Sequence, residues 1–356
     1  MKTAVVLFNL GGPDSPKAVK PFLFNLFNDK FIITLPQPLR LMLAGFISWK
    51  RAPIARLIYE KIGGKSPILE NTRAQAEALE RELAIKGDYK VFVAMRHWHP
   101  FTKEVVADVV KYEPEKVILL PLYPQYSTTT TASAFSAWYE EAYRQKLNAS
   151  HHPVCCYPFD NHYIDALVER IEKSYDAAAK HGTPRILYSA HGLPQKIVDK
   201  GDPYQWQVER TVSAVTRKLG AKDYTICYQS RVGRLQWLTP STDDEIRRAG
   251  KDGIPIVLVP ITFVSEHSET LVELDIEYRE LAHSCNVPHY ERTQTVGTHP
   301  EFIRTLSWLC EATVFYPSCT NSLGRICPNE SKKCGFKEWH PTAQAPGIGM
   351  NMVEEL

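Results

Sequence analysis

The sequence predicts an α/β fold made of two doubly wound domains with parallel sheets. Strand-like runs alternate with helix-period segments along the chain, which is the order that βαβ units produce. Most of these runs are apolar throughout, as is typical of strands covered by helices on both faces. The length of 356 residues exceeds the roughly 250–300 residues at which a single core stops growing, so we expect two domains.

The expected strands are short apolar runs rich in β-branched or aromatic residues. They are residues 4–10, 90–96, 116–123, 154–159, 185–191, 223–230 and 254–263. Helix-period segments lie between several of them, at residues 71–85, 102–112, 163–180 and 204–219. The N-terminal run is read as a strand because it lacks the small-residue cleavage site of a signal peptide. No run approaches the roughly 18 apolar residues of a membrane-spanning helix.

Two segments resemble each other within the chain. KVILLPLYPQYSTTTTASAF (116–135) and PIVLVPITFVSEHSETLVEL (255–274) both contain a strand, a proline, an aromatic residue, a serine and then a helix. This echo indicates two similar halves joined near 155–185. Ligands of such sheets bind beyond the carboxyl ends of the strands. The residues that follow the strands are Asn9 to Gly12, Arg96–His97, Tyr123 to Ser127, His191, Gln229 to Arg231 and Glu266–His267.

Charge and motifs exclude several functions. The formal net charge is only +2, so the sequence gives no sign of the basic surface that nucleic-acid binding requires. The glycine turns GGPDSP (11–16) and IGGKSP (62–67) match neither a dinucleotide nor a Walker fingerprint, so no nucleotide cofactor is expected. A G-x-S-x-G nucleophile elbow is also absent.

A row of acids follows the strand at 254–263. Glu266, Glu269, Glu273 and Glu277 share one face of an ideal α-helix, with His267 at its start. Apolar residues flank the row on both sides, and they are Leu271, Leu274 and Tyr278 on one side and Val272 and Ile276 on the other. A solvated charged face is the plain alternative, but acids between two apolar flanks indicate the wall of a cleft.

His191 follows a strand and precedes the turn signal Gly-Leu-Pro. A single histidine is often a structural hydrogen bonder. At the carboxyl end of a parallel strand it can instead act as a base or a metal ligand, because neutral imidazole does either near pH 7. Together with the acids it suits a divalent ion that is held transiently, as a substrate would be.

The eight cysteines favour thiols or metal ligands over a disulfide framework, since no export signal is apparent. Cys319, Cys327 and Cys334 crowd the tail, and Cys155 and Cys156 are adjacent. The tail spacing is not the C-x2-C of zinc ribbons. A loop-borne metal site that needs a fourth ligand and a set of free thiols both remain open.

Residues 22–58 mix apolar runs with prolines and contain the basic pair Lys50–Arg51. They fit an ordinary buried helix pair. They also fit an apolar lip over a pocket that touches a membrane surface, with basic side chains at its edge.

Taken in order, these motifs resemble those of ferrochelatases, the enzymes that insert ferrous iron into a porphyrin to make haem. The resemblance covers about residues 4–280. It runs through NLGGPDSP (9–16), YEKIGGKSPI (59–68), MRHWHPFT (95–102), LPLYPQYS (120–127), YSAHGLP (188–194), GDPY (201–204), YQSRVG…WL (228–238) and PITFVSEHSETLVELDIEY (260–278).

The resemblance implies two Rossmann-like domains with a porphyrin cleft between them. We expect domains at 1–160 and 161–310, with the lip at about 22–58 facing a membrane and a cysteine-containing extension at 311–356. The resemblance puts the substrate iron on His191 and Glu269, with His191 also accepting pyrrole protons. It assigns a metal or proton conduit to Glu266, His267 and Glu273. The residues that it assigns to the porphyrin pocket are Leu10, Tyr59, Ser66, Arg96, His97 and Tyr126.

The reaction implied is ferrous iron plus protoporphyrin IX giving protohaem, the last step of haem biosynthesis, in a cytoplasmic enzyme that is peripheral on the inner membrane surface. The alternatives are a coproporphyrin III ferrochelatase, a chelatase for another divalent metal, and a porphyrin carrier that does not consume iron. The oligomeric state stays open.

Some bacterial members of the family hold a [2Fe-2S] cluster. The animal enzymes carry a cluster cysteine where this chain has Thr128. The ligands expected here are Cys155 or Cys156 with Cys319, Cys327 and Cys334.

Overall fold

The computed structural model describes residues 2–231, 233, 235–315 and 324–339. The chain divides into two compact units. Unit 1 contains Met1–Tyr157, Leu306–Pro328 and Cys334–Leu356, and unit 2 contains Pro158–Thr305 and Asn329–Lys333. The first segment of unit 1 ends at Tyr157, and the described tail is divided between the two units. The cleft expected between the domains stays a prediction.

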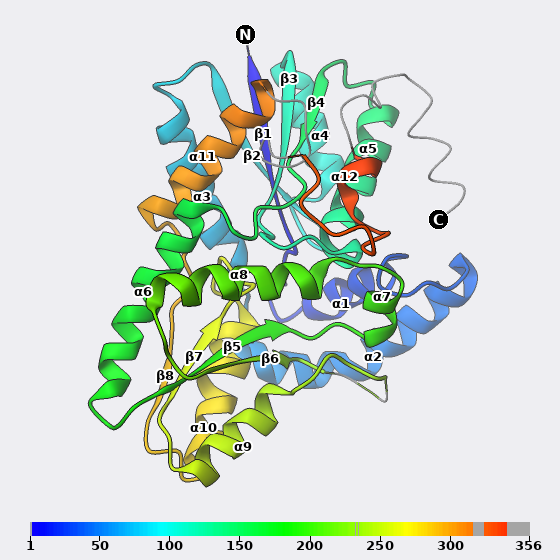
Figure 1. Cartoon of the computed structure of the whole chain (residues 1–356). Coiled ribbons are helices and arrows are strands. Elements are labelled where there is room, and N and C mark those ends of the chain that lie inside the picture. The colour runs from blue at the N-terminus through cyan, green and yellow to red at the C-terminus, as the bar shows by residue number, and fades with distance from the viewer. Residues whose placement is uncertain (1, 232, 234, 316–323, 340–356) are drawn as a thin grey trace. The chain divides into compact units, whose positions relative to one another are not determined.

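Unit 1 contains a four-stranded parallel sheet in the order β2-β1-β3-β4 (Figure 1). Its strands are β1 (Thr3–Asn9), β2 (Tyr89–Met95), β3 (Lys116–Pro121) and β4 (Ser150–Pro153). Its helices are α1 (Val19–Phe27), α2 (Gln37–Glu60), α3 (Ile68–Leu83), α4 (Thr102–Tyr112), η1 (Thr128–Ala132), α5 (Ser133–Arg144) and α12 (Gly335–Glu338). Every residue of β1 is buried, which explains its unbroken apolar sequence.

Unit 2 repeats this plan, with a parallel sheet in the order β6-β5-β7-β8. Its strands are β5 (Arg185–His191), β6 (Tyr224–Gln229), β7 (Ile256–Pro260) and β8 (Tyr290–Arg292). Its helices are α6 (Asn161–Ala179), α7 (Gln195–Asp199), α8 (Tyr204–Leu219), α9 (Thr242–Asp252), η2 (Glu269–Glu277) and α10 (Tyr278–Ser284), and α11 (Pro300–Phe315) runs from unit 2 into unit 1. The matching strand orders confirm the internal echo seen in the sequence.

The core of each unit follows from alternate strand positions that pack on helices. Ala4, Val6 and Phe8 of β1 lie in one buried cluster with side chains of α4 and α5. Leu187 of β5 lies in the equivalent cluster with α9, η2 and α10. Because both clusters bury one face of a sheet, the polar side chains at the strand ends have a rigid base.

One predicted strand was wrong and another was missed. Residues 154–159 are not a strand, because the edge strand is the preceding segment Ser-His-His-Pro of β4, which pairs with β3. Its polar sequence gives no apolar run to detect. The missed strand is β8, which has only three residues and pairs with β7. Short edge strands owe their conformation to the neighbouring strand rather than to their own propensity.

The helix that carries the acid row is not an α-helix. Glu269–Glu277 form a π-helix, η2, which has i→i+5 hydrogen bonds and a wider turn. The expectation that all four acids share one α-helical face was therefore wrong. Glu277 is exposed, whereas Glu269 and Glu273 are partly buried. π-Turns are rare and recur at functional sites.

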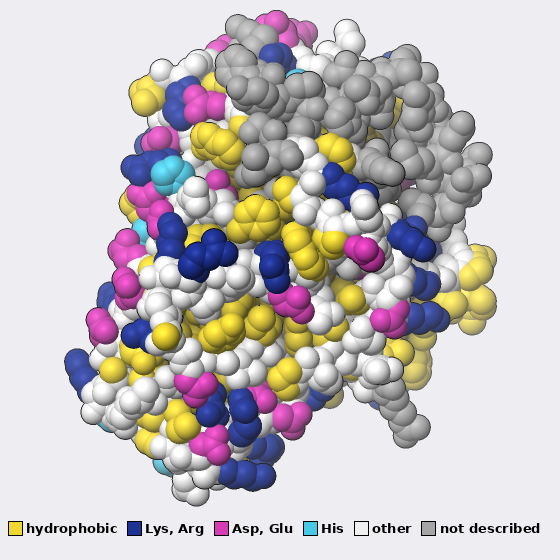
Figure 2. Space-filling model, viewed as in Figure 1, with side chains coloured by type: hydrophobic (Ala, Val, Ile, Leu, Met, Phe, Trp, Pro, Cys, Tyr) yellow, Lys and Arg dark blue, Asp and Glu magenta, His cyan; other side chains and the backbone are white. Residues whose placement is uncertain are grey.

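α2 has an unusual distribution of side chains. It buries small residues, namely Ala44, Ser48 and Ala52, while its large apolar side chains are exposed. Those that are more than half exposed are Leu39, Met42, Phe46, Trp49, Ile54 and Leu57. Figure 2 shows hydrophobic side chains gathered at the right-hand edge, where Figure 1 places the start of α2. α2 is thus not an ordinary buried helix, and in the described part of the chain no helix is long and apolar enough to cross a membrane.

Gly250 supplies a stability test of the packing in unit 2. A Cβ atom there would lie 2.2 Å from the backbone oxygen of Cys285. Alanine in a helix normally gains up to about 1 kcal/mol over glycine. We expect Gly250→Ala instead to lower the free energy of unfolding by about 1–3 kcal/mol, because the carbonyl cannot move aside without shifting the backbone. Urea denaturation measures this.

The matched control is Gly45→Ala in α2, where no atom lies within 4 Å of an added Cβ. This variant is expected to gain about 0.5–1 kcal/mol. If Gly250→Ala and Gly45→Ala changed the free energy of unfolding equally, this would contradict the close contact at Gly250.

Candidate active site

His191 is placed by the end of β5 and by hydrogen bonds on both sides of its backbone. Its N–H donates to Oγ1 of Thr262 at 3.3 Å, and its carbonyl accepts the hydroxyl of Tyr204 at 3.0 Å. The next residue is Gly192, where a Cβ would lie 2.6 Å from the backbone oxygen of Gln229. Glycine therefore lets the chain turn closely beside β6 and leaves the imidazole at the strand end.

The imidazole of His191 is paired with Glu269. Its Nδ1 lies 2.9 Å from Oε2 of Glu269, and the two side chains are 43% and 30% exposed. Burial lowers the pKa of His191, but the charge of Glu269, its hydrogen bond and the charge of Glu273 outweigh burial, so the net pKa is raised. Burial acts against ionisation of Glu269 too, yet the charge and hydrogen bond of His191 bring the pKa of Glu269 down to about 2.

This pairing fixes the chemistry of the ring. A carboxylate can only accept, so the shared proton is on Nδ1 of His191. In the described residues Nε2 of His191 has no protein partner. That nitrogen can therefore take a proton or bind a metal ion, while Glu269 stabilises the imidazolium that forms.

Glu273 is held by three donors. Its Oε1 accepts the backbone N–H of Ser230 at 2.8 Å and the hydroxyl of Tyr278 at 3.2 Å, and its Oε2 accepts the hydroxyl of Ser230 at 2.5 Å. Burial and the charge of Glu269 raise the pKa of Glu273, which its bonds to Ser230 oppose. Ser230 has a positive φ of 58°, which is rare outside glycine and is common at functional sites.

Opposite shifts in the pKa of two neighbouring carboxylates suit different tasks. Glu269 stays ionised, whereas Glu273 gains a proton more readily. Such a pair can hold a cation at one carboxylate and pass a proton at the other.

Glu266 has a different environment. Both of its carboxylate oxygens face Nη1 of Arg292, at 3.0 and 3.2 Å, and Oε1 also accepts the N–H of Thr295 at 2.9 Å. Burial opposes ionisation, but Arg292 and these hydrogen bonds leave the pKa of Glu266 lowered. The sequence grouped Glu266 with Glu269 and Glu273, whereas the structure pairs it with an arginine.

His267 lies at the start of η2. Its Nδ1 accepts the backbone N–H of Glu269 at 3.0 Å, and burial lowers its pKa. Its ring contacts Phe263, with the centroids 4.6 Å apart, and Phe263 contacts His191 in turn. His267 is therefore adjacent to the His191–Glu269 pair.

In unit 1 several of the porphyrin candidates meet at the end of β1. The backbone N–H of His97 donates to the carbonyl of Leu10 at 3.0 Å, and that of Ser66 donates to Pro13 at 2.8 Å. Gly12 approaches Ser66 so closely that a Cβ would lie 2.5 Å from the Cβ of the serine. His97 is almost fully buried, which lowers its pKa to about 3 and keeps it neutral.

Three other candidates have distinct surroundings. Arg96 follows β2 and is partly exposed. Tyr59, at the end of α2, is 8% exposed and packs in a cluster with α1. Tyr126, after β3, is fully buried beside Cys155 and Cys156.

The tail reaches the Tyr126 cluster. At Gly335 a Cβ would lie 2.4 Å from the ring of Tyr126, so glycine permits the contact. The ring of Trp339 stacks on Tyr139 of α5 with centroids 5.5 Å apart. These contacts fix the tail segment 335–339 to unit 1.

Thiols gather in the same place. Cys156 contacts both Cys155 and Cys327, and Cys327 contacts Cys334. The contact with Cys155 is the largest cause of the raised pKa of Cys156, and the contact with Cys327 opposes it. The contact with Cys327 is the largest cause of the raised pKa of Cys334. All four cysteines are buried, and Cys319 lies outside the described residues.

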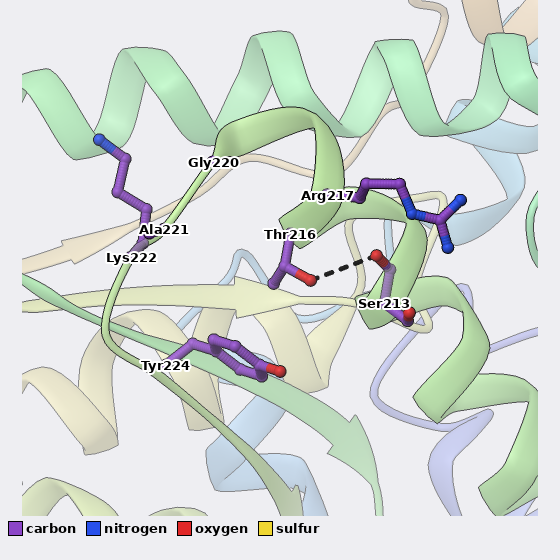
Figure 3. A pocket seen from close by; sticks show the side chains of 7 residues that line it. All are labelled: Ser213, Thr216, Arg217, Gly220, Ala221, Lys222 and Tyr224. Atoms are coloured by element: carbon purple, nitrogen blue, oxygen red, sulfur yellow. Dashed lines mark hydrogen bonds between the residues drawn. The ribbon is translucent and has the colours of Figure 1, made fainter.

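Across the described residues, no set of three or more histidine, cysteine or acidic side chains has the arrangement of a metal site. A pocket of about 410 Å³ lies instead at the end of α8 (Figure 3). Its polar lining includes Thr216, Arg217 and Lys222, and none of the candidate site residues takes part.

Sequence reasoning missed the partners that hold the candidate side chains. Asp29 and Ser133 bind Arg96, Tyr278 donates to Glu273, and Arg292 pairs with Glu266. Asp29 has the clearest signal of these, because it is an acid within the apolar segment 22–58. Ser230 directly follows β6, and this position at a strand end is its signal in the sequence.

Comparison with known proteins identifies the family. The ferrochelatase family model matches residues 2–314. The ferrochelatase of Wolbachia sp. subsp. Drosophila simulans (strain wRi) is 54% identical over 314 residues, which cover 87% of this chain and 99% of that protein. The ferrochelatase of Pelagibacter ubique (strain HTCC1062) is 46% identical over 341 residues, covering 94% and 98%.

Solved structures agree on the fold. The sirohydrochlorin chelatase SirB from Bacillus subtilis subspecies spizizenii, in complex with cobalt, superposes with a TM-score of 0.54 at 12% identity, covering 89% of this chain and 97% of that one. At this identity the likeness supports the fold alone. Because the family model and the bacterial relatives span nearly all of the two units, the chain belongs to the ferrochelatase family, the lyases that insert iron into a porphyrin in haem biosynthesis.

Proposed function

We propose that the chain inserts ferrous iron into protoporphyrin IX through His191 and Glu269, with Glu273 as the proton relay. The observation that carries the proposal is the 2.9 Å pair between Nδ1 of His191 and Glu269, which leaves Nε2 as the basic nitrogen. The family supplies the reaction, and this pair supplies groups that suit it.

The chemistry needs two things from the protein. Two pyrrole protons must leave the porphyrin, and a hydrated ion must lose water before it binds the ring nitrogens. Neutral His191 can accept a proton at Nε2, and the ionised Glu269 then balances the charge of the imidazolium. Glu273, whose pKa is raised, can take that proton onward, which restores neutral His191 for the second pyrrole proton. Glu269 also offers the oxygen ligand that a divalent ion exchanges for water.

An anaerobic assay with purified protein, ferrous iron and protoporphyrin IX tests this function. Porphyrin fluorescence should fall as haem absorption appears, with repeated turnover. Coproporphyrin III and cobalt are the parallel substrates, and faster turnover of either would move the assignment to that chelatase. Binding of porphyrin without consumption of iron would indicate a carrier and would contradict the proposal.

We further propose that a [2Fe-2S] cluster binds at the thiol group of unit 1. Such clusters need four thiolates, and Cys155, Cys156, Cys327 and Cys334 supply four buried sulfurs that contact one another. Cys319 is the alternative fourth ligand. The thiols would have to lose their protons and turn toward the metal, because they do not yet have the arrangement of a site. The family model ends at residue 314, so family membership alone does not imply this cluster.

Visible absorption after anaerobic purification tests the cluster. We expect broad bands at roughly 300–600 nm that dithionite bleaches, as thiolate-bound iron gives. Cys327→Ser should remove the bands and the bound iron and sulfide, whereas Cys310→Ala, a change at a buried thiol outside the group, should keep them. A colourless wild-type protein after reconstitution with iron and sulfide would exclude a cluster.

The exposed apolar face of α2 supports peripheral contact with a membrane. Phe46 and Trp49 form a ring contact at 6.3 Å, and Lys50 and Arg51 next to them are exposed. Apolar side chains that enter the interface beside basic residues bind anionic lipid surfaces.

Vesicle sedimentation measures the contact. With vesicles of phosphatidylethanolamine and phosphatidylglycerol, we expect Phe46→Ser/Trp49→Ser to weaken binding at least about tenfold, since each buried aromatic contributes roughly 1–2 kcal/mol. Ile85→Ser, at an exposed apolar residue of unit 1 outside α2, is the control. Equal binding of both variants would contradict a role of α2.

A further inference from the structure

Asp29 is a buried carboxylate at the end of the lip helix α1. Its side chain is fully buried, and its ionised form therefore requires partners on every side. Oδ1 accepts the backbone N–H of Phe31 at 2.9 Å. Oδ2 accepts the hydroxyl of Ser133 in a short hydrogen bond and faces Nη2 of Arg96 at 3.0 Å.

The same partners fix the guanidinium of Arg96. Its Nε donates to the hydroxyl of Ser133 at 2.6 Å, while Nη2 pairs with Asp29. The backbone of Arg96 is anchored as well, because its N–H donates to the carbonyl of Asn9 at 2.9 Å. In the described residues Nη1 has no protein partner, and a quarter of the side chain is exposed. Nε and Nη2 of the guanidinium are thus held by the protein, and Nη1 can bind a ligand.

The lip helices touch the segment that follows Arg96 at two further points. Nδ2 of Asn25 in α1 donates to the carbonyl of His97 at 3.1 Å. The ring of Trp98 packs in the buried cluster that joins α1 to α2. Among these contacts of the lip, Asp29 is the only one made through a charged side chain. Its ion pair therefore sets the orientation of the Arg96 guanidinium.

We propose that Asp29 is a positioning residue that orients Arg96 to bind a carboxylate of the porphyrin, and that it links the lip to recognition of that carboxylate. This rests on the proposed function, in which Arg96 lines the porphyrin pocket. A guanidinium pairs with a carboxylate best when its plane is fixed in advance, because ordering a free arginine side chain opposes binding. Loss of Asp29 should therefore weaken substrate binding and leave the chemical step unchanged.

The test compares protoporphyrin with its dimethyl ester, which lacks both carboxylates. We expect Asp29→Asn to raise KM for protoporphyrin about tenfold, the size of one charge-assisted contact, with kcat and the KM of the ester within about twofold of wild type. Arg96→Ala should show the same selectivity. The double variant should be no worse than Arg96→Ala alone, because Asp29 acts through Arg96.

Asp252→Asn is the matched control, since Asp252 pairs with Arg185 at 2.8 Å in unit 2. It should change neither KM. An equal loss toward protoporphyrin and its ester in Asp29→Asn would assign Asp29 a purely structural role and overturn the inference. If Arg96→Ala discriminates between the substrates and Asp29→Asn does not, the inference alone fails. If Arg96→Ala does not discriminate, the role of Arg96 in the proposed function fails with it.

Ser133→Ala gives a second measurement in case Asp29→Asn does not fold. It removes the hydroxyl that bridges Asp29 and Arg96 and keeps both charges. We expect a rise of roughly threefold in KM for protoporphyrin alone, as for the loss of one neutral hydrogen bond. No change in Ser133→Ala together with an unfolded Asp29→Asn would count against the inference.

Discussion

His191→Ala is expected to lower kcat for iron insertion by about 100- to 10,000-fold, the usual contribution of a positioned general base. Nε2 of His191 is the proposed proton acceptor, because Nδ1 is paired with Glu269. Alanine removes this nitrogen. The fold should persist, because the backbone hydrogen bonds to Thr262 and Tyr204 do not use the ring. Turnover and thermal unfolding of the same preparation measure the two effects.

The matched control is His162→Ala. His162 pairs with Glu301 at 2.7 Å, and its side chain is 40% exposed, close to the exposure of His191. Both variants remove one histidine–glutamate pair from unit 2. A loss of activity in His162→Ala comparable to that in His191→Ala would show that the effect comes from stability rather than from the base. Near-normal turnover in His191→Ala would exclude His191 as the proton acceptor.

The fold was largely predictable because its strongest signals are local. β1, α4 and α8 lie within one residue of their expected limits, since apolar runs and helix-period segments mark them directly. The family and the reaction were also predicted correctly. β4 was misplaced because a polar edge strand takes its conformation from pairing with β3.

The sequence could indicate only those candidate site residues that lie at or after the carboxyl ends of strands. His191 and Glu269 are 78 residues apart in sequence, but they meet because His191 ends β5 and Glu269 lies after the neighbouring parallel strand β7. Their partners follow no such rule. Arg292 comes from the three-residue β8, and Asp29 meets Ser133 across 104 residues. The spacing of the acids gives no signal for the π-helical turn of η2.

Glu269→Gln is expected to lower kcat at least about 100-fold, because the amide keeps the shape but loses the charge that supports His191 and binds the divalent ion. Glu301→Gln, at the carboxylate that pairs with His162, is the control and should keep activity within about twofold. Iron-binding measurements separate the two roles of Glu269, since a loss of metal affinity lowers activity even where the base is intact. Unchanged kcat in Glu269→Gln would remove this carboxylate from the mechanism.

The pH dependence of kcat in Glu269→Gln gives a second prediction, which has a definite direction. In the wild type Glu269 helps to hold the pKa of His191 above its ordinary value of 6.5, so neutral His191 appears, and the rate rises, only as pH passes that raised pKa. The glutamine side chain carries no charge, so the charge of Glu269 no longer opposes the effect of burial, and the pKa of His191 falls. The acidic limb of residual kcat against pH should therefore move to lower pH, although the maximum rate is smaller. A limb that stays in place or moves to higher pH would mean that the group titrating in the wild type is not the paired imidazole.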